Sequence, residues 1–340
     1  MDQGGRFRTA HGQCPPLCRD CPVAELNRTQ AKGETDMVGW VIGAAAAIAA
    51  AGGGAWMLGA KTQQPKRRPI GELPRAPYET VRFESEGVPM VGWLIRPDAA
   101  GTDSGGPLPL VVIAHGWGSN RSRVLRYAHP LVEAGYAVFV YDARSHGESG
   151  SVKAPTGLMF MADIEAAVAT AARLPGVDAS RIAVLGHSMG GLGALLAYAG
   201  GLPVRAVITD NAPLTIETIL RSELRRRNLP VFPLARIILR VWLLRAGVPY
   251  REVRRIDMPA WVAANAEAVR GGGGKPVLMI HSTGDPVIPA EELRSVTARA
   301  PVEHRFVDAQ GHSCSEQDPA FWQAVLPFLQ RHLAGGGPRR

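Results

Sequence analysis

A serine between two glycines is the pattern with the clearest chemical potential in this sequence. Gly186, Ser188 and Gly190 form G-x-S-x-G, with His187 and Met189 at the variable positions. A β-rich apolar run precedes the pattern and an apolar run with helical spacing follows it. A serine on such a sharp turn adopts strained backbone angles, so its neighbours need glycine, and the helix directs its first N–H groups at the reacting centre. We therefore predict that Ser188 is a nucleophile.

A second glycine-rich turn predicts a site that stabilises negative charge. His115, Gly116, Trp117 and Gly118 follow another apolar run. On a strand–turn–helix scaffold with this kind of nucleophile, two backbone N–H groups stabilise the developing oxyanion, one from such a turn and one from the residue after the nucleophile. We expect these donors to be Trp117 and Met189. Gly116 would let the backbone approach the substrate, and we expect His115 to orient the turn.

The acid that would orient the base has two candidates. Asp285 lies in a turn after a predicted strand, and Asp210 ends the strand before it. A buried carboxylate beside a histidine fixes the tautomer of the imidazole and stabilises its cation. We favour Asp285, because its loop leads into the last strand–helix unit, where the candidate base lies.

His312 is the predicted general base. It follows Gly311 between the last predicted strand and the last helix. His281 and His304 lie within predicted strands and are poorer candidates. The chain order Ser188, Asp285, His312 is the order of a hydrolase triad on a strand–turn–helix scaffold.

The scaffold that must position these residues is predicted from short apolar runs that alternate with helical patterns. Such runs, bounded by Gly, Pro or Asp, are typical of buried parallel strands, and alternation with helices implies right-handed crossovers. The fold class is therefore α/β, a mostly parallel sheet covered on both faces. Strands are expected at 108–114, 137–141, 181–185, 206–209, 275–281 and 303–307, after an antiparallel pair at 78–85 and 91–96. Helices are expected at 123–134, 160–174, 189–199, 291–300 and 320–333.

Two segments do not fit this alternation. Residues 212–274 are too long for a plain connection, so we expect an inserted helical cap over the carboxyl edge of the sheet. Residues 142–150, which end a strand, contain Asp142 and Arg144, and we expect them to organise a loop and not to act on substrate.

Charge is concentrated in the predicted cap. The net charge of the chain is +8, and residues 217–257 hold ten arginines against four acids. The arginines alternate with Leu, Ile, Val and Trp, which predicts amphipathic helices with a basic face. A nucleic-acid interface would place aromatic residues between basic ones on a groove-reading element, so we expect no nucleic-acid partner.

Together, these motifs resemble the α/β-hydrolase superfamily. More narrowly, the chain is similar to bacterial membrane-anchored serine hydrolases related to serine aminopeptidases and prolyl-oligopeptidase-type catalytic domains. The resemblance covers residues 78–333 and implies the hydrolase fold, its triad and a short N-terminal anchor. Residues 212–274 match no pattern that identifies a substrate, so the resemblance in fold does not indicate which substrate the protein would act on.

An uncharged segment near the start predicts a single-pass membrane anchor. Residues 37–60 contain no charged side chain, and this segment is long enough to cross a bilayer as a helix, although 15 of its 24 residues are Gly or Ala. A cleaved export signal or a flexible arm are the alternatives. Basic residues are more frequent after the segment than before it, which favours a cytoplasmic catalytic domain.

The predicted organisation is therefore a tail at 1–36, an anchor at 37–60, a basic linker at 61–77, a hydrolase domain at 78–335 and a tail at 336–340. We expect the first tail to be disordered, and translation from Met37 is an alternative that would omit it. Cys14, Cys18 and Cys21 in that tail lack a fourth metal ligand with usable spacing, so no metal or other cofactor is expected.

These features predict hydrolysis of a carboxylic ester, derived from a lipid, through an acyl-enzyme on Ser188. A peptidase acting on short peptides and an acyltransferase are the enzymatic alternatives. A non-catalytic, membrane-tethered binding module on the same fold is the alternative from another class. Small-molecule substrates and the membrane are the expected partners, and the oligomeric state stays open.

Overall fold

The computed structural model describes residues 22–98 and 106–334. The chain forms two compact units, residues 1–54 and residues 55–340. The first unit contains most of helix α1 (Pro22–Thr62), and the second contains the end of that helix and everything after it.

Helix α1 begins earlier than the sequence suggested. It includes residues 22–36, so the expectation of a disordered tail is wrong for this part. These residues are rich in strong helix formers, and their only proline is the first residue, where proline is tolerated. Among the described helices, α1 alone has a segment long and apolar enough to cross a membrane, Gln30–Thr62. Residues 1–21, with the three clustered cysteines, lie outside the described residues.

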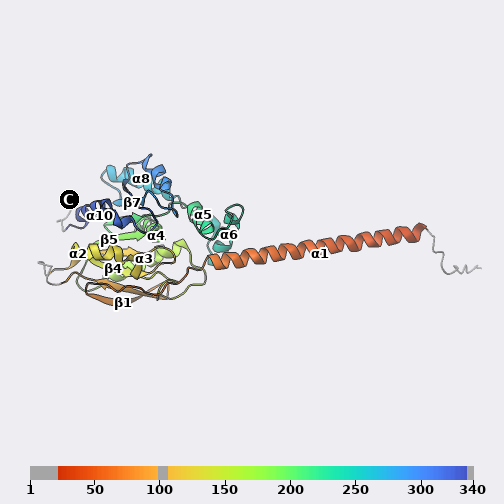
Figure 1. Ribbon diagram of the computed structural model, residues 1–340, viewed down its shortest axis with the longest axis horizontal. Coiled ribbons are helices and arrows are strands. Elements are labelled where there is room, and N and C mark those ends of the chain that lie inside the picture. The colour runs from red at the N-terminus through yellow and green to blue at the C-terminus, as the bar shows by residue number, and fades with distance from the viewer. Residues whose placement is uncertain (1–21, 99–105, 335–340) are drawn as a thin grey trace, which may run out of the picture. The chain divides into compact units, whose positions relative to one another are not determined.

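The second unit is built on one eight-stranded sheet (Figure 1). Its strand order is β1-β2-β4-β3-β5-β6-β7-β8. The pairs β1–β2 and β2–β4 are antiparallel and the others are parallel, which confirms the predicted mostly parallel sheet. The strands are β1 (Tyr78–Ser85), β2 (Val88–Ile95), β3 (Leu108–Ala114), β4 (Ala137–Tyr141), β5 (Val177–His187), β6 (Ala206–Asp210), β7 (Val277–Ser282) and β8 (Glu303–Val307).

Helices cover both faces of this sheet, as the uninterrupted apolar strands require. One face packs against α3 (Gly157–Ala171), α4 (Met189–Ala199), α8 (Met258–Arg270) and α9 (Glu291–Thr297). The other face packs against α2 (Leu125–Glu133) and α10 (Pro319–Leu333), with two short 3₁₀ turns, η2 (Arg121–Val124) and η3 (Ser315–Gln317), beside them. The parallel strands therefore end at one edge, and the loops that follow them meet there.

The cap is shorter than predicted. Helices α5 (Ile216–Arg226), α6 (Leu234–Ala246) and α7 (Tyr250–Val253) share a small apolar core of their own. Helix α8 lies within the predicted cap range but buries Met258, Val262 and Ala266 in the main core. Its apolar stripe faces the sheet layer, so α8 is one of the helices that cover the sheet, and only α5–α7 form a separate cluster.

Candidate active site

Ser188 occupies a strained turn between β5 and α4. Its backbone angles are φ 53° and ψ −120°, and its side chain is largely buried. The flanking glycines are required by space: a Cβ on Gly186 would lie 2.4 Å from the carbonyl oxygen of Gly190, and one on Gly190 would lie 2.3 Å from that of Ala114. The backbone N–H of Ser188 donates to the carbonyl oxygen of Asp210 over 2.8 Å, which ties the turn to β6.

The structure brings the three predicted triad residues together. His312 Nε2 lies 2.8 Å from Ser188 Oγ, and His312 Nδ1 lies 2.6 Å from Asp285 Oδ2. The second oxygen of Asp285 accepts hydrogen bonds from the N–H groups of Val287 and Ile288, at 2.7 and 3.1 Å. An ionised Asp285 would keep the proton of His312 on Nδ1 and leave Nε2 free to accept the hydroxyl proton of Ser188.

Asp210, the rival acid, has different partners. Its Oδ2 accepts a hydrogen bond from the hydroxyl of Tyr127 at 2.6 Å, and its main chain holds Ser188. Burial raises the pKa of Asp210 to about 6. The carboxyl group of Asp210 therefore contacts Tyr127, whereas Asp285 is the acid that contacts His312.

The other two histidines that were considered lie outside this contact chain. His281 Nε2 is hydrogen bonded to the carbonyl oxygen of Ile288 at 2.9 Å and is 4.0 Å from Asp285. His304 lies on the exposed side of β8 and is hydrogen bonded to Val302.

The turn after β3 lies against Ser188. A Cβ on Gly116 would be 3.0 Å from the Cβ of Ser188, so only glycine allows this approach without displacement. Trp117 and Met189 both line the cavity beside the serine. Met189 is the first residue of α4, where a helical N–H lacks an intrahelical partner. The indole of Trp117 also packs against His146 and Phe160, so it supports the turn and lines the cavity at the same time.

His115 links two loops. Its Nδ1 donates to the carbonyl oxygen of Gly116 at 2.8 Å, and its Nε2 accepts the N–H of Ala143 at 3.0 Å. This pattern requires the neutral imidazole. Burial lowers the pKa of His115 to about 4, which keeps that form dominant at neutral pH. The side chain therefore fixes the turn after β3 relative to the loop after β4.

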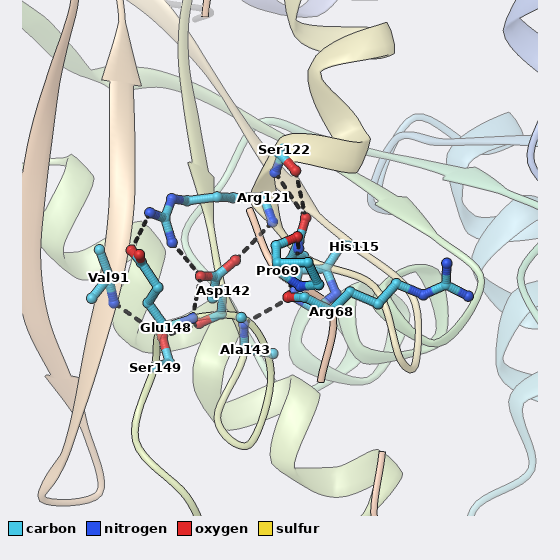
Figure 2. Close-up of polar contacts among 12 residues, drawn as sticks. Arg68, Pro69, Val91, His115, Arg121, Ser122, Asp142, Ala143, Glu148 and Ser149 are labelled. Carbon is cyan, nitrogen blue, oxygen red and sulfur yellow. Dashed lines mark hydrogen bonds and ion pairs between the residues drawn. The ribbon is translucent and has the colours of Figure 1, made fainter. Parts of the chain in front are cut away.

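The loop after β4 is organised by Asp142 (Figure 2). Its carboxylate accepts the backbone N–H groups of Arg121 and Glu148, at 2.7 and 2.8 Å, and forms an ion pair with the guanidinium of Arg121. Arg121 also contacts Glu148 at 2.5 Å. Ser149 donates to the carbonyl oxygen of Asp142 at 2.6 Å. These contacts agree with the structural role expected of this loop.

Two residues that hold the main chain of His312 were not predicted from the sequence. His187 Nε2 donates to the carbonyl oxygen of His312 at 2.6 Å, and the Asn211 amide donates to the same oxygen at 3.2 Å. Asn211 also donates to Ser315 and accepts the N–H of Ser282. The sequence signals for them are weak: His187 is a variable position of G-x-S-x-G, and Asn211 is of a residue type that tolerates the left-handed backbone it has here, with φ 51°.

A cavity of 650 Å³ opens over Ser188 and His312. This volume is in the range of small-molecule sites. Many of its walls are apolar, formed by α4, the loop after β6 and the cap. These apolar residues are Leu192, Leu196, Leu214, Ile219, Leu239, Leu243, Val248 and Val253.

The end of α1 also forms part of the cavity wall, which the sequence did not indicate. Thr62 and Gln63 line the cavity and are almost fully buried. Trp242 of α6 donates to the carbonyl oxygen of Gly59 at 3.0 Å, and Arg245 donates to the side chain of Gln63 at 2.9 Å. The last turns of α1 are therefore packed into the cap.

Within residues 22–98 and 106–334, no group of three His, Cys, Asp or Glu side chains is arranged to hold a metal ion. Cys314, two residues after His312, is a free thiol with partial exposure.

Comparison with known proteins relates the sequence and the fold to those of hydrolases. The model of the serine aminopeptidase S33 family matches residues 105–240. An esterase from Pyrococcus furiosus, Pf2001, superposes with a TM-score of 0.59 at 23% identity, over 79% of this chain and all of that chain. The chain therefore has the α/β-hydrolase fold, and residues 105–240 resemble the serine aminopeptidase S33 family.

Two curated relatives are similar over part of their length. The uncharacterised protein YqkD of Bacillus subtilis is 32% identical over 53% of this chain and 56% of its own length. The quorum-quenching protein AidA of Acinetobacter baumannii is 32% identical over 43% of this chain and 47% of its own length. The chain thus spans about half the length of these relatives.

Proposed function

We propose that this protein is a serine hydrolase that cleaves carboxylic esters with an apolar acyl group. The observation that carries the proposal is the unbroken contact chain from Ser188 through His312 to Asp285, with its serine end in the cavity. The apolar wall formed by α4 and the cap suits an acyl chain. The esterase fold of Pf2001 supports the same reaction class.

In the proposed reaction, Ser188 Oγ attacks the ester carbonyl carbon while His312 Nε2 takes the hydroxyl proton. The N–H groups of Trp117 and Met189 stabilise the oxyanion. The carbon–oxygen bond to the alcohol breaks, and His312 returns its proton to the departing alcohol. A water molecule, deprotonated by His312, then cleaves the acyl-enzyme and releases the acid and free Ser188.

A fluorophosphonate probe tests the nucleophile in the full-length protein. Wild type should be labelled, Ser188→Ala should not, and Ser295→Ala, an exposed serine on α9, should be labelled like wild type. A folded wild-type protein that reacts with neither the probe nor any p-nitrophenyl ester would contradict the proposal and favour the non-catalytic binding module.

A peptidase on short peptides is the second candidate, because the matching family model is that of a serine aminopeptidase. The same triad would cleave an amide. Aminoacyl p-nitroanilides compared with p-nitrophenyl esters of increasing chain length separate the two: a higher kcat/KM for the anilides would replace the ester assignment. Added alcohols or amines as acceptors would reveal acyl transfer.

We also propose that α1 anchors the protein in a membrane, with the hydrolase unit in the cytoplasm. The apolar stretch of α1 supports the anchor, and the basic residues that follow support the orientation. The full-length protein should stay in the membrane pellet after alkaline carbonate extraction. Release into the supernatant would contradict the anchor, and digestion by protease added outside spheroplasts would contradict the orientation.

A further inference from the structure

Three arginines line the cavity close to the turn after β3. They are Arg68 from the segment after α1, Arg123 from η2 and Arg126 from α2. They come from different elements, yet each side chain borders the same space as Ser188 and His312. None of them was used in the proposed mechanism.

Hydrogen bonds hold the first two arginines in place. Arg68 Nε donates to the carbonyl oxygen of Gly118 at 2.9 Å. The side chain of Asn120 donates to the carbonyl oxygen of Arg68 at 3.1 Å and accepts the N–H of Arg123 at 3.3 Å. Asn120 therefore joins both backbones. In Figure 2 the guanidinium of Arg68 extends away from the cluster around Asp142.

The charges of this arginine cluster are not balanced. Arg121, in the same 3₁₀ turn, is neutralised by Asp142 and Glu148. Of these three arginines, only Arg126 has an ion pair within the described residues, with Glu316 at 3.3 Å; Arg226, which also lines the cavity, pairs with Glu223. Burial and the charges of Arg68 and Arg126 lower the pKa of Arg123. Arg68 and Arg123 are both exposed, and placing like charges close together still costs free energy, which a bound anion would recover.

The cluster is also linked to the segment that holds the base. Glu316, the partner of Arg126, follows His312 by four residues in the same loop. The part of the cavity lined by α4 is apolar, with Leu192 and Leu196, whereas the cap contributes apolar residues together with the charged Glu217, Glu223 and Arg226. An ester whose acyl chain lies against α4 has its alcohol in the same cavity that the three arginines border.

We propose that Arg68, Arg123 and Arg126 bind an anionic group on the alcohol part of the substrate. The substrate class is then an acyl ester of an anionic alcohol, such as a glycerol phosphate. This inference rests on the proposed ester hydrolase function and adds the chemical class of the alcohol. Planar guanidinium groups suit phosphate oxygens, which they can contact with two parallel hydrogen bonds.

Two substrates that differ only in the anion test the inference. 1-Lauroylglycerol 3-phosphate and 1-lauroylglycerol have the same acyl chain and ester bond, and both can be presented to the full-length protein in neutral detergent micelles. We expect wild type to prefer the phosphate by about tenfold or more in kcat/KM, which corresponds to about 1.4 kcal/mol. Arg68→Gln and Arg123→Gln should each raise KM for the phosphate more than for the neutral ester, and so remove most of the preference.

The control variant is Arg82→Gln, an exposed arginine on β1 that does not line the cavity, and it should keep the wild-type preference. Turnover of the neutral ester without any preference for the phosphate would overturn the arginine subsite and leave the hydrolase proposal intact. Failure of both substrates, together with absence of fluorophosphonate labelling, would instead overturn the hydrolase function.

Two further experiments identify whether a change in turnover comes from the arginine subsite or from the charge of the micelle surface. Glycerol 3-phosphate should competitively inhibit turnover of the neutral ester in wild type, and much less in Arg123→Gln. If anionic micelles increase turnover of the neutral ester as much as the substrate phosphate does, and Arg123→Gln responds equally, then surface charge explains the effect and the subsite is wrong.

Discussion

The indole Nε1 of Trp242 donates a hydrogen bond to the carbonyl oxygen of Gly59 over 3.0 Å and contacts the hydroxyl of Thr62 at 3.1 Å. These residues connect cap helix α6 with the last turns of α1. Gln63 donates back to the carbonyl oxygen of Trp242 at 3.0 Å. The end of α1 is thus part of the wall of the substrate cavity, and a change in this short segment is expected to reach the site through the cap.

Gly59→Ala is expected to loosen the cap and lower kcat/KM. A Cβ at this position would lie 2.4 Å from Cγ1 of Val241, so helix α1 and helix α6 would have to separate. Such overpacking typically costs about 1–3 kcal/mol. Hydrogen exchange of α6 and ester turnover of the full-length protein measure both effects.

Two variants control this prediction. Gly54→Ala should have little effect, because nothing lies within 4 Å of the added Cβ. The double variant Gly59→Ala, Val241→Ala should recover much of the loss, since it removes the opposing methyl groups. A Gly59→Ala protein with wild-type turnover and exchange would show that the packing of α1 on the cap has no influence on the site.

Replacement of the two candidate acids should separate their roles. Asp285→Asn removes the charge that holds the proton on Nδ1 of His312, and the comparable change in a serine protease triad lowers kcat by about 10⁴. Asp210→Asn retains an oxygen for the hydroxyl of Tyr127, so we expect less than about a tenfold change. Steady-state kinetics with a soluble p-nitrophenyl ester gives both values. Equal losses, or a larger loss for Asp210→Asn, would reassign the acid.

Gly190→Ala should destabilise the fold as well as the site. The added methyl group would lie 2.3 Å from the carbonyl oxygen of Ala114 and 2.6 Å from that of His115, and neither backbone atom can rotate away. We expect the free energy of unfolding to fall by about 3 kcal/mol or more. Gly273→Ala, with open space around its Cβ, should change it by less than about 0.5 kcal/mol. Denaturant titration compares the two, and a tolerated Gly190→Ala would disprove the close approach of α4 to the turn after β3.

Stability should decrease as the pH falls from about 6.5 toward 4, in part because of His115. Its folded-state pKa, about 4, lies below that of the unfolded chain, so folding favours the neutral ring. The contribution is present above the unfolded pKa and is lost on acidification, with a size on the order of 3 kcal/mol. Burial also lowers the pKa of His146, to about 3, which adds to the same trend.

The variant His115→Gln should lose less stability over this pH interval than wild type, since it has no titrating ring. His304→Gln, on the exposed side of β8, is the control and should follow the wild-type curve. Urea unfolding at several pH values gives the comparison. Parallel curves for His115→Gln and wild type would show that His115 is not held neutral by burial.

Local patterns in the sequence were sufficient for the framework. Apolar runs and their bounding Gly and Asp residues predicted the strands, and helix α4 was placed at residues 189–199, the bounds that the structure has. The turn that holds Ser188 was predictable because its glycines are required by contacts within a few residues, between Gly186 and Gly190. Hydropathy does not predict the start of α1, because the residues before the apolar segment are polar although they favour a helix.

The sequence by itself determined the α/β class, the strained turn at Ser188 and the order of the candidate triad, because each depends on neighbouring residues or on strand–helix alternation. Only the tertiary structure decided which carboxylate contacts His312, where the cap ends and which arginines border the cavity. It also showed that Trp242 meets Thr62 across 180 positions of the chain. Such contacts depend on how distant elements pack, and no local pattern of residue types specifies which of several acids, helices or arginines will face the serine.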